Sequence, residues 1–433
     1  MTMKRYHWIT KFAALRFLLS GCETYLIAPT AWIYIKSMDQ TTFFLALVLS
    51  SYNFGCIIAG PVAGFLTDRL GNPRFIFLFS CVTKMLSYII YSINLSGYFP
   101  LFGRLISGLG EMGVTVLLGQ IALQPEKESR IGNFVILDSA YCLGTVFGPG
   151  IGSFITFRKN ILGWEINEGN SPGIVLTVIW LVFFIFATLL PNDIWIATGA
   201  RNFEDNLTVS DDEAQKSSNK IDLERKLPEI SPEKELVYAV WDSRIFGLLF
   251  LIFSSEVFSS TSTFYVPVLA LDHFHLQLIH TKLLFLNCTL FTLILFICIY
   301  LLSQYVEERK LIVAALFIQI IAISCFTYLA FSWNQVTDVQ WYFLLLYICL
   351  GMPYFAYPLG NSILSKITDP RNATFIQGLS YGGLHVAVVV SRVVVSFVFT
   401  KPKLLWYSFG MFILWLAGVI WYGTQYKRMV PDT

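Results

Sequence analysis

The sequence predicts an all-α integral membrane protein with about twelve spanning helices arranged as two six-helix bundles. The chain of 433 residues is 55% hydrophobic and only 13% charged, whereas a soluble chain carries about 25% charged residues. Its mean hydropathy is +0.63. The apolar segments are long enough to cross a bilayer, because a spanning helix needs about 20 residues. One long polar stretch divides these segments into two groups of six.

In chain order, the apolar segments predict helices as follows. The first group covers residues 12–35, 41–66, 74–95, 97–123, 131–156 and 172–190, and the second covers 244–269, 280–302, 310–331, 341–366, 375–399 and 405–424. The first segment follows a short basic N-terminus and contains Arg16 and Glu23. It is too long and too polar for a cleaved signal peptide, so we expect it to remain as the first spanning helix.

The polar stretch between the two groups covers residues 192–242 and holds twelve acidic and six basic residues. This composition is typical of a solvated linker. We therefore expect an N-terminal six-helix bundle (residues 1–191), a linker (192–242) and a C-terminal six-helix bundle with a short tail (243–433).

Lysine and arginine residues outside the predicted helices are distributed unevenly. Most share the side of the N-terminus, and those on the other side are Lys36, Arg158, Lys159, Lys401 and Lys403. Because loops rich in Lys and Arg stay in the cytosol, we expect both termini and the linker to be cytosolic.

Several functional classes lack support in the sequence. The basic residues are scattered, which argues against nucleic-acid binding. The sequence contains no GxxxxGK[ST] loop, which would indicate an ATP-driven pump. It contains no nucleophile paired with a base, which would indicate an enzyme. The eight cysteines lie in apolar segments without a CxxC pair, so we interpret them as packing residues. We expect a monomer without metal or cofactor, whose partners are the lipid bilayer and a small-molecule or ion substrate.

The turn after the second predicted helix carries a charged motif. A glycine one turn before an aspartate lets two helices approach closely, so Asp68 can cap and pair across the gap between them. Gly71 then turns the chain within a short loop. The alternative is an ordinary charged turn. The motif reads Gly64-Phe-Leu-Thr-Asp68-Arg69-Leu-Gly71-Asn-Pro-Arg74.

Two further patterns lie in the fourth and fifth predicted helices. The fourth reads Arg104-Leu-Ile-Ser-Gly108-Leu-Gly110-Glu111, and the fifth contains Gly144, Gly148, Pro149, Gly150 and Gly152. Small residues at a spacing of four let membrane helices pack backbone to backbone, and the proline introduces a bend. Packing alone explains the glycines of the fifth helix equally well.

These three patterns resemble the signatures of the major facilitator superfamily. The resemblance covers nearly all of the chain and implies a transporter that works by alternating access. It implies that Asp68 latches the two halves on the cytosolic side and that Arg104 takes part in proton transfer or substrate contact. The sequence departs from the family pattern at Asn72 and Pro73, where basic residues are usual. The second half matches weakly.

Shorter runs resemble the ceroid-lipofuscinosis lysosomal branch of this superfamily, the major facilitator superfamily domain-containing protein 8 type. They cover residues 51–55, 168–172, 258–260 and 264–267. This resemblance implies a lysosomal or late endosomal membrane.

Eight charged residues lie away from the ends of the predicted helices: Arg16, Lys84, Arg104 and Arg392 against Glu23, Glu111, Asp138 and Glu256. Each costs about 2.5–3.5 kcal/mol at a helix centre, so they must pair, snorkel or line water. Arg104 and Glu111 lie seven apart and are expected on one helix face. We expect Arg16 to snorkel toward the cytosolic end. The other seven are candidates for substrate binding or proton coupling.

A histidine cluster follows the seventh predicted helix, beside Asp272. It could bind metal or sense acid pH, although loop histidines usually do neither. Its members are His273, His275 and His280.

Three functions remain open. The first is a secondary transporter coupled to protons through the buried carboxylates. The second is a lysosomal or endosomal anion channel on the same fold, conducting past Lys84, Arg104 and Arg392. The third is a scaffold without transport activity, against which the gating motifs argue, because a scaffold has no use for a two-state latch. The sequence does not predict the substrate.

Overall fold

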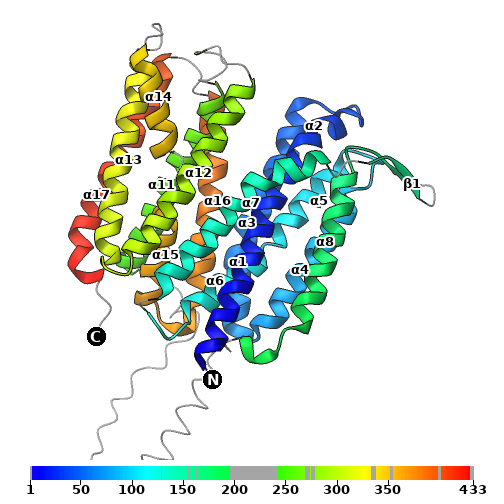
Figure 1. The fold of residues 1–433 in the computed structure, drawn as a ribbon, viewed down its shortest axis with the longest axis horizontal. Helices are drawn as coiled ribbons and strands as arrows, with labels where there is room; N and C mark the ends of the chain where they lie inside the picture. The colour runs from blue at the N-terminus through cyan, green and yellow to red at the C-terminus, as the bar shows by residue number, and fades with distance from the viewer. Residues whose placement is uncertain are drawn as a thin grey trace, which may run out of the picture.

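The computed structural model describes residues 2–127, 129–154, 157–161, 164–195, 242–268, 274, 278–332, 338–351, 355–397 and 401–429. Figure 1 shows two groups of helices side by side. We call the side that holds the start of α1 the lower face, and the opposite side, with the small hairpin, the upper face. The bundles are in contact near the lower face, and their ribbons diverge toward the upper face (Figure 1).

The N-terminal bundle contains six crossings and one hairpin. Its helices are α1 (Thr2–Leu26), α2 (Ala28–Lys36), α3 (Thr42–Leu70), α4 (Pro73–Tyr91), α5 (Tyr98–Leu109), α6 (Met112–Ala122), α7 (Arg130–Phe154) and α8 (Ser171–Leu189), followed by the short 3-10 helix η1 (Asn192–Ile194). Between α7 and α8, strand β1 (Lys159–Ile161) pairs antiparallel with β2 (Trp164–Ile166).

The C-terminal bundle repeats the arrangement. Its helices are α11 (Ser243–Val268), α12 (Leu278–Leu302), α13 (Glu308–Phe331), α14 (Asp338–Gly351), α15 (Ala356–Ile367), α16 (Ala373–Phe397) and α17 (Lys401–Gln425), with 3-10 helices η3 (Pro370–Asn372) and η4 (Tyr426–Met429). When α1–α2, α5–α6 and α14–α15 are each counted as one crossing, the described residues form twelve crossings. The predicted fold class is confirmed. Contacts between the bundles run mainly from α3 and α6 to α16 and from α7 to α12 and α15.

The motif turn between α3 and α4 has a physical reason at each position. Gly71 ends α3 with a φ of 65°, in the left-handed region that favours glycine. The Asn72 side chain accepts a hydrogen bond from the backbone N–H of Phe75, at 3.1 Å, and so caps α4. Pro73 occupies the first helical position, where its missing N–H is harmless. The residues that depart from the family pattern therefore start the next helix.

Two crossings that the sequence predicts as continuous helices are interrupted within the described residues. The first breaks at Ile27, before Pro29 in the first turn of α2. The fourth breaks at Gly110–Glu111. The first crossing also begins at Thr2 instead of residue 12. Hydropathy locates only the apolar part of a helix, so it misses polar turns at the ends and breaks in the middle.

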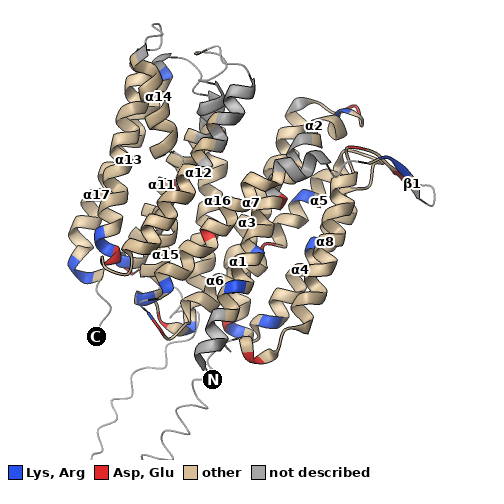
Figure 2. Cartoon of the chain, in the orientation of Figure 1, with Lys and Arg blue, Asp and Glu red and all other residues tan. Residues whose placement is uncertain are grey.

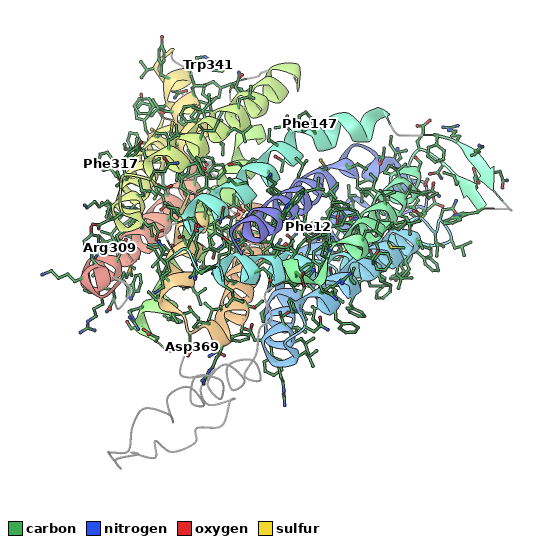
Figure 3. All side chains as sticks on the ribbon, turned by 60° about the horizontal axis from the view of Figure 1, so that its bottom comes forward. Phe12, Phe147, Arg309, Phe317, Trp341 and Asp369 are labelled. Carbon is green, nitrogen blue, oxygen red and sulfur yellow. The ribbon has the colours of Figure 1, made fainter. Side chains whose placement is uncertain are left out.

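The outward surface of the bundles is apolar. Phe317 points outward and is 66% exposed, whereas Phe12, inside the N-terminal bundle, is 5% exposed (Figure 3). Among the described residues, ten helices are long and apolar enough to cross a membrane. Charged residues gather at the lower face, with others on the hairpin and a few inside the bundles (Figure 2). The chain is therefore a multi-pass integral membrane protein, because so much apolar surface must face lipid.

Candidate functional site

Four charged side chains meet inside the N-terminal bundle. Lys84 Nζ of α4 lies 2.5 Å from Glu23 Oε1 of α1 and 2.5 Å from Glu111 Oε1 at the break between α5 and α6. Arg16 Nη2 of α1 lies 3.1 Å from Glu111 Oε2. None of the four is more than 1% exposed. We call Arg16, Glu23, Lys84 and Glu111 the charge network; its two cations and two anions balance.

The prediction that Arg16 snorkels toward the membrane surface is wrong. Its side chain is fully buried, pairs with Glu111 and donates a hydrogen bond to Ser20. Its guanidinium also stacks on Trp180 of α8, 4.4 Å from the ring centroid. A carboxylate inside the bundle offers Arg16 a partner that the position of Arg16 along α1 does not reveal.

Neutral donors from three other helices hold the two carboxylates. The Trp180 indole N–H donates to Glu23 Oε2 at 3.1 Å, and Ser107 of α5 donates to Glu23 Oε1 at 3.0 Å. Tyr52 of α3 donates to Glu111 Oε1 at 3.0 Å. Hydrogen bonds to a charged acceptor in a low-dielectric interior are strong and directional. The network is therefore fixed from five of the six crossings of the bundle.

Two glycines of the fourth crossing, Gly108 and Gly110, make room for this network. A Cβ on Gly110 would lie 2.8 Å from Cγ of Lys84, so only glycine lets the lysine pass over the break and reach Glu111. A Cβ on Gly108 would lie 2.1 Å from the backbone oxygen of Tyr52. The RxxxGxG pattern thus combines close helix packing with placement of a buried cation.

Arg104 lies beside the network rather than in it. It is 3% exposed, and its guanidinium stacks on Tyr52 at 4.6 Å from the ring centroid. Its Nε and Nη1 atoms have no hydrogen-bond partner in the part of the chain that the structure describes. A short break at Gly110–Glu111 separates Arg104 from Glu111, and Tyr52 contacts both side chains.

The network extends to the other bundle through α16. The Tyr381 hydroxyl donates to Glu111 Oε2 at 3.4 Å. One turn further, the His385 Nδ1 atom lies 3.0 Å from Asn53 Oδ1 of α3, with donor and acceptor set by the imidazole tautomer. Sequence reasoning missed both residues. The only available signal was a lone histidine in an apolar helix, which is more often a packing residue.

Three of the predicted candidates lie outside the network. Asp138 of α7 and Glu256 of α11 are 5% and 8% exposed and come from different bundles. Arg392 is partly buried on α16, two turns beyond His385.

Close backbone contacts join the bundles near the lower face. The Phe375 backbone N–H, in the first turn of α16, donates to Asp68 Oδ2 at 2.8 Å. A Cβ on Gly64 would lie 2.6 Å from Phe375 Cα, and one on Gly60 would lie 2.4 Å from the backbone oxygen of Gly378. We call these contacts, with the bond from Arg130 Nη1 to the Ser365 backbone oxygen at 2.5 Å, the lower seam.

The remaining motif residues do not cross between the bundles. Arg74 donates to the Thr188 backbone oxygen at 2.6 Å and to Asn192, both in the N-terminal bundle. Arg69 is exposed and lies over Phe65, 5.5 Å from the ring centroid. The expected approach of the two halves at Asp68 is thus observed, with the carboxylate capping a helix rather than pairing with a basic side chain.

The glycines of α7 serve helix packing where the structure describes them. A Cβ on Gly144 would lie 2.2 Å from the backbone oxygen of Leu18, so α1 and α7 touch backbone to backbone. Gly148 is buried. The surroundings of Pro149, Gly150 and Gly152 lie outside the described part, as do His273 and His275 and the side chain of His280.

The Major Facilitator Superfamily sequence profile matches residues 13–391. The chain therefore belongs to the Major Facilitator Superfamily, a family of membrane transporters. Two curated relatives match parts of it. The uncharacterized MFS-type transporter YfiU of Bacillus subtilis (strain 168) is 24% identical over 191 residues, which are 43% of this chain and 36% of YfiU. The quinolone resistance protein NorA of Staphylococcus aureus (strain Mu50) is 27% identical over 134 residues, 30% of this chain and 34% of NorA. The matches span about a third of these relatives.

Solved structures share the fold over nearly the whole chain. The proton:xylose symporter XylE superposes with a TM-score of 0.73 at 16% identity, over 99% of this chain and 97% of XylE. The human organic anion transporter MFSD10 superposes with a TM-score of 0.63 at 16% identity, over 98% of this chain and 100% of MFSD10. A bacterial homologue of the iron transporter ferroportin, in an outward-facing state, gives 0.69 at 11% identity, over 97% and 99%.

Proposed function

We propose that this protein is a secondary active transporter that moves a small solute or ion by alternating access, coupled to protons. The observation that carries the proposal is the bond from Tyr381 to Glu111. It joins a charge network buried in one bundle to a helix of the other bundle. Any movement of α16 away from α3 must therefore change the surroundings of a buried carboxylate.

The chemistry of coupling follows from the balance of the charge network. Lys84 is held between Glu23 and Glu111, so a proton on either carboxylate removes half of its counter-charge. The Lys84 ammonium can then attract a negatively charged substrate group, or α4 can change its position. We propose Glu23 and Glu111 as proton acceptors, Lys84 as their switchable partner, and Arg104, with two unpaired donors, as a substrate-contact residue. Asp138, Glu256 and Arg392 are proposed to line the path between the bundles.

The lower seam is proposed as the gate of the transport cycle. It consists of hydrogen bonds and glycine contacts, which can break and re-form as the bundles move. We propose Asp68 as its latch residue, with Gly64 and Gly71 giving the close approach and the turn, and Arg69 and Arg74 supporting the turn. The moving units are residues 1–191 and 243–433, joined by 192–242.

We further propose that the lower face is cytosolic and that the membrane is lysosomal or late endosomal. The gathering of charged residues at the lower face (Figure 2) supports the orientation. The short runs that resemble the ceroid-lipofuscinosis lysosomal branch support the compartment. The anion-channel alternative is not favoured, because the Lys84 ammonium is neutralised by two carboxylates and is unavailable to a passing anion.

Flux measurements test the proposal. The purified full-length chain is reconstituted in liposomes and offered a panel of labelled small metabolites and ions under an imposed pH gradient. We expect saturable uptake of at least one solute that a protonophore abolishes, and loss of the gradient dependence in Glu23→Gln and Glu111→Gln. The exposed hairpin variant Glu165→Gln is the control. Unitary current steps with flux that does not saturate would refute the transporter and favour a channel.

A further inference from the structure

The short 3-10 helix η4 is held against the first turn of α13. The Arg309 guanidinium of α13 lies over the Tyr426 ring of η4, 5.1 Å from the centroid, and its Nη1 atom donates to the Tyr426 backbone oxygen at 3.2 Å. The Tyr422 hydroxyl, near the end of α17, donates to the Arg309 backbone oxygen at 2.9 Å. These contacts bring together two segments that lie 117 residues apart in the sequence.

The contact gathers four basic side chains from the two segments. Lys310 follows Arg309 directly, and Lys427 and Arg428 follow Tyr426 directly, so each lies within two residues of the contact. Lys310, Lys427 and Arg428 are exposed. Figure 2 shows basic residues at the lower ends of α13 and α17. We call Arg309, Lys310, Lys427 and Arg428 the basic patch.

The protein only partly neutralises the basic patch. Within the described part of the chain, one carboxylate pairs with it: Glu307 lies 2.8 Å from Arg309 Nη2 and 3.7 Å from Lys310 Nζ. Lys427 and Arg428 form no ion pair with any described residue. The patch therefore carries excess positive charge at the surface.

The next acidic residue in the sequence does not reduce this excess. The Glu308 side chain is 9% exposed and is directed into the C-terminal bundle. Its Oε1 atom accepts hydrogen bonds from Ser362 at 2.8 Å and from Lys366 at 2.5 Å, both on α15. Its charge is thus already paired with a cation outside the patch.

Apolar surface begins directly above the patch. On α13, Val313 is 49% exposed and Phe317 is 66% exposed, and on α17, Ile420 is 59% exposed. Phe317 and Arg309 lie on the same flank of the molecule (Figure 3). Because exposed apolar surface of this extent faces acyl chains, the patch lies where the headgroups of the same lipids are found.

We propose that the basic patch binds the phosphate-bearing headgroup of an anionic membrane phospholipid. Clusters of about four or more Lys and Arg residues beside a membrane helix are typical of anionic-lipid binding. A guanidinium offers a fork of donors to phosphate oxygens, and ammonium groups add point charges. A bound headgroup also relieves the mutual repulsion of the exposed cations, while its acyl chains cover the apolar flank of α13 and α17.

The test counts lipids bound to the purified full-length protein in detergent by native mass spectrometry. The probe is dioleoylphosphatidylglycerol, the zwitterionic comparison is dioleoylphosphatidylcholine, and glycerophosphoglycerol is the same headgroup without acyl chains. We expect the anionic lipid to bind about tenfold more tightly than either comparison. The triple variant Lys310→Gln/Lys427→Gln/Arg428→Gln should lose most of this preference. It leaves Arg309, which holds η4, in place.

A matched variant separates the basic patch from the overall charge of the protein. Lys11→Gln/Lys127→Gln/Arg371→Gln removes the same charge from exposed positions on the N-terminal bundle and η3 and should bind the anionic lipid as wild type. Equal loss of preference in the two triple variants overturns the proposal. So does wild-type protein that binds the two lipids equally, or that binds the soluble headgroup as tightly as the lipid.

A charge-retaining variant separates loss of the patch from loss of the fold. Lys310→Arg/Lys427→Arg/Arg428→Lys should keep the preference for the anionic lipid, and all variants are compared as monodisperse peaks on gel filtration. Equal loss in the charge-retaining and the neutral variant would contradict an electrostatic headgroup site. None of these outcomes depends on transport, so the proposed function stands or falls separately.

Discussion

Lys84 reaches two carboxylates at 2.5 Å and is completely buried. Such a cation stabilises the bundle less by attraction than by preventing two uncompensated anions, since breaking a buried ion pair is worse than never having formed one. Arg16 is a buried cation whose partner is Glu111, and without that carboxylate its own charge would be uncompensated. The charge network is therefore a structural unit as well as a candidate for coupling.

Removal of the lysine should be strongly destabilising. We expect Lys84→Met to lower the stability of the purified protein by about 3–5 kcal/mol, because Glu23 loses its cation and Glu111 keeps only Arg16. The melting temperature in detergent measures the change. Lys159→Met, on the exposed hairpin strand β1, is the matched control and should melt as wild type. An unchanged melting temperature in Lys84→Met would show that the carboxylates are not ionised together.

The indole of Trp180 should matter through one atom. Trp180→Phe keeps an aromatic ring beside Arg16 but removes the N–H that donates to Glu23 Oε2. Hydrogen bonds to charged groups contribute about 1.5–3 kcal/mol, so we expect a smaller loss than for Lys84→Met. Thermal unfolding again measures it, with Trp406→Phe, at a 74% exposed position, as control. Equal melting of the two variants would contradict the assignment.

At this scale the sequence allowed half of the site to be predicted. Charged residues in apolar segments stand out because each is costly in lipid, so Glu23, Lys84 and Glu111 were identifiable. Their neutral partners, Tyr52 and Trp180, were not. In a chain with 16% aromatic residues, no local signal separates a ring that donates a hydrogen bond from one that packs.

At the scale of helices, the seam between α3 and α16 depends on residues without side chains. The Gly378 backbone lies so close to Gly60 that a Cβ on Gly378 would be 2.3 Å from the Gly60 oxygen. Hydropathy predicted both helices but not that they pack against each other. Glycines in close backbone contact occur both within the N-terminal bundle and between the two bundles, so the glycines alone do not identify the partner helix.

A methyl group at this seam should shift the molecule between states. We expect Gly378→Ala to hold α3 and α16 apart and to favour the conformation with the lower face open. Gly383→Ala, on the same helix with no atom within 4 Å of its Cβ position, should have no effect. Spin labels at Glu126→Cys and Lys310→Cys, on the lower ends of the two bundles, report the distance by double electron–electron resonance. Identical distance distributions in the two variants would argue against a gate at the seam.

For the whole molecule, two helix ends of opposite polarity tie the bundles together. Asp68 caps the N-terminus of α16, and Arg130 binds a backbone oxygen in the last turn of α15. Both interactions are favourable with the helix dipole. Sequence patterns identified Asp68, whereas Arg130 lay at the start of a predicted helix and carried no signal, since its partner is 235 residues away.

Loss of either tie should open the lower face, and loss of both should open it further. We expect Asp68→Asn and Arg130→Gln each to increase the population with a long distance between the same pair of spin labels. In the double variant the free-energy change of the opening equilibrium should be about the sum of the two single changes, because the residues share no partner. A double variant no more open than either single one would indicate that a different contact holds the seam.

The breaks in the first and fourth crossings have a mechanical consequence. Each joins an upper arm to a lower rod through one or two residues, one of which is Glu111. An arm of this kind can swing on its joint while the rod beneath it stays docked. Closure above a bound solute then needs only local bending, and the larger rotation of the two bundles can follow as a distinct, slower stroke.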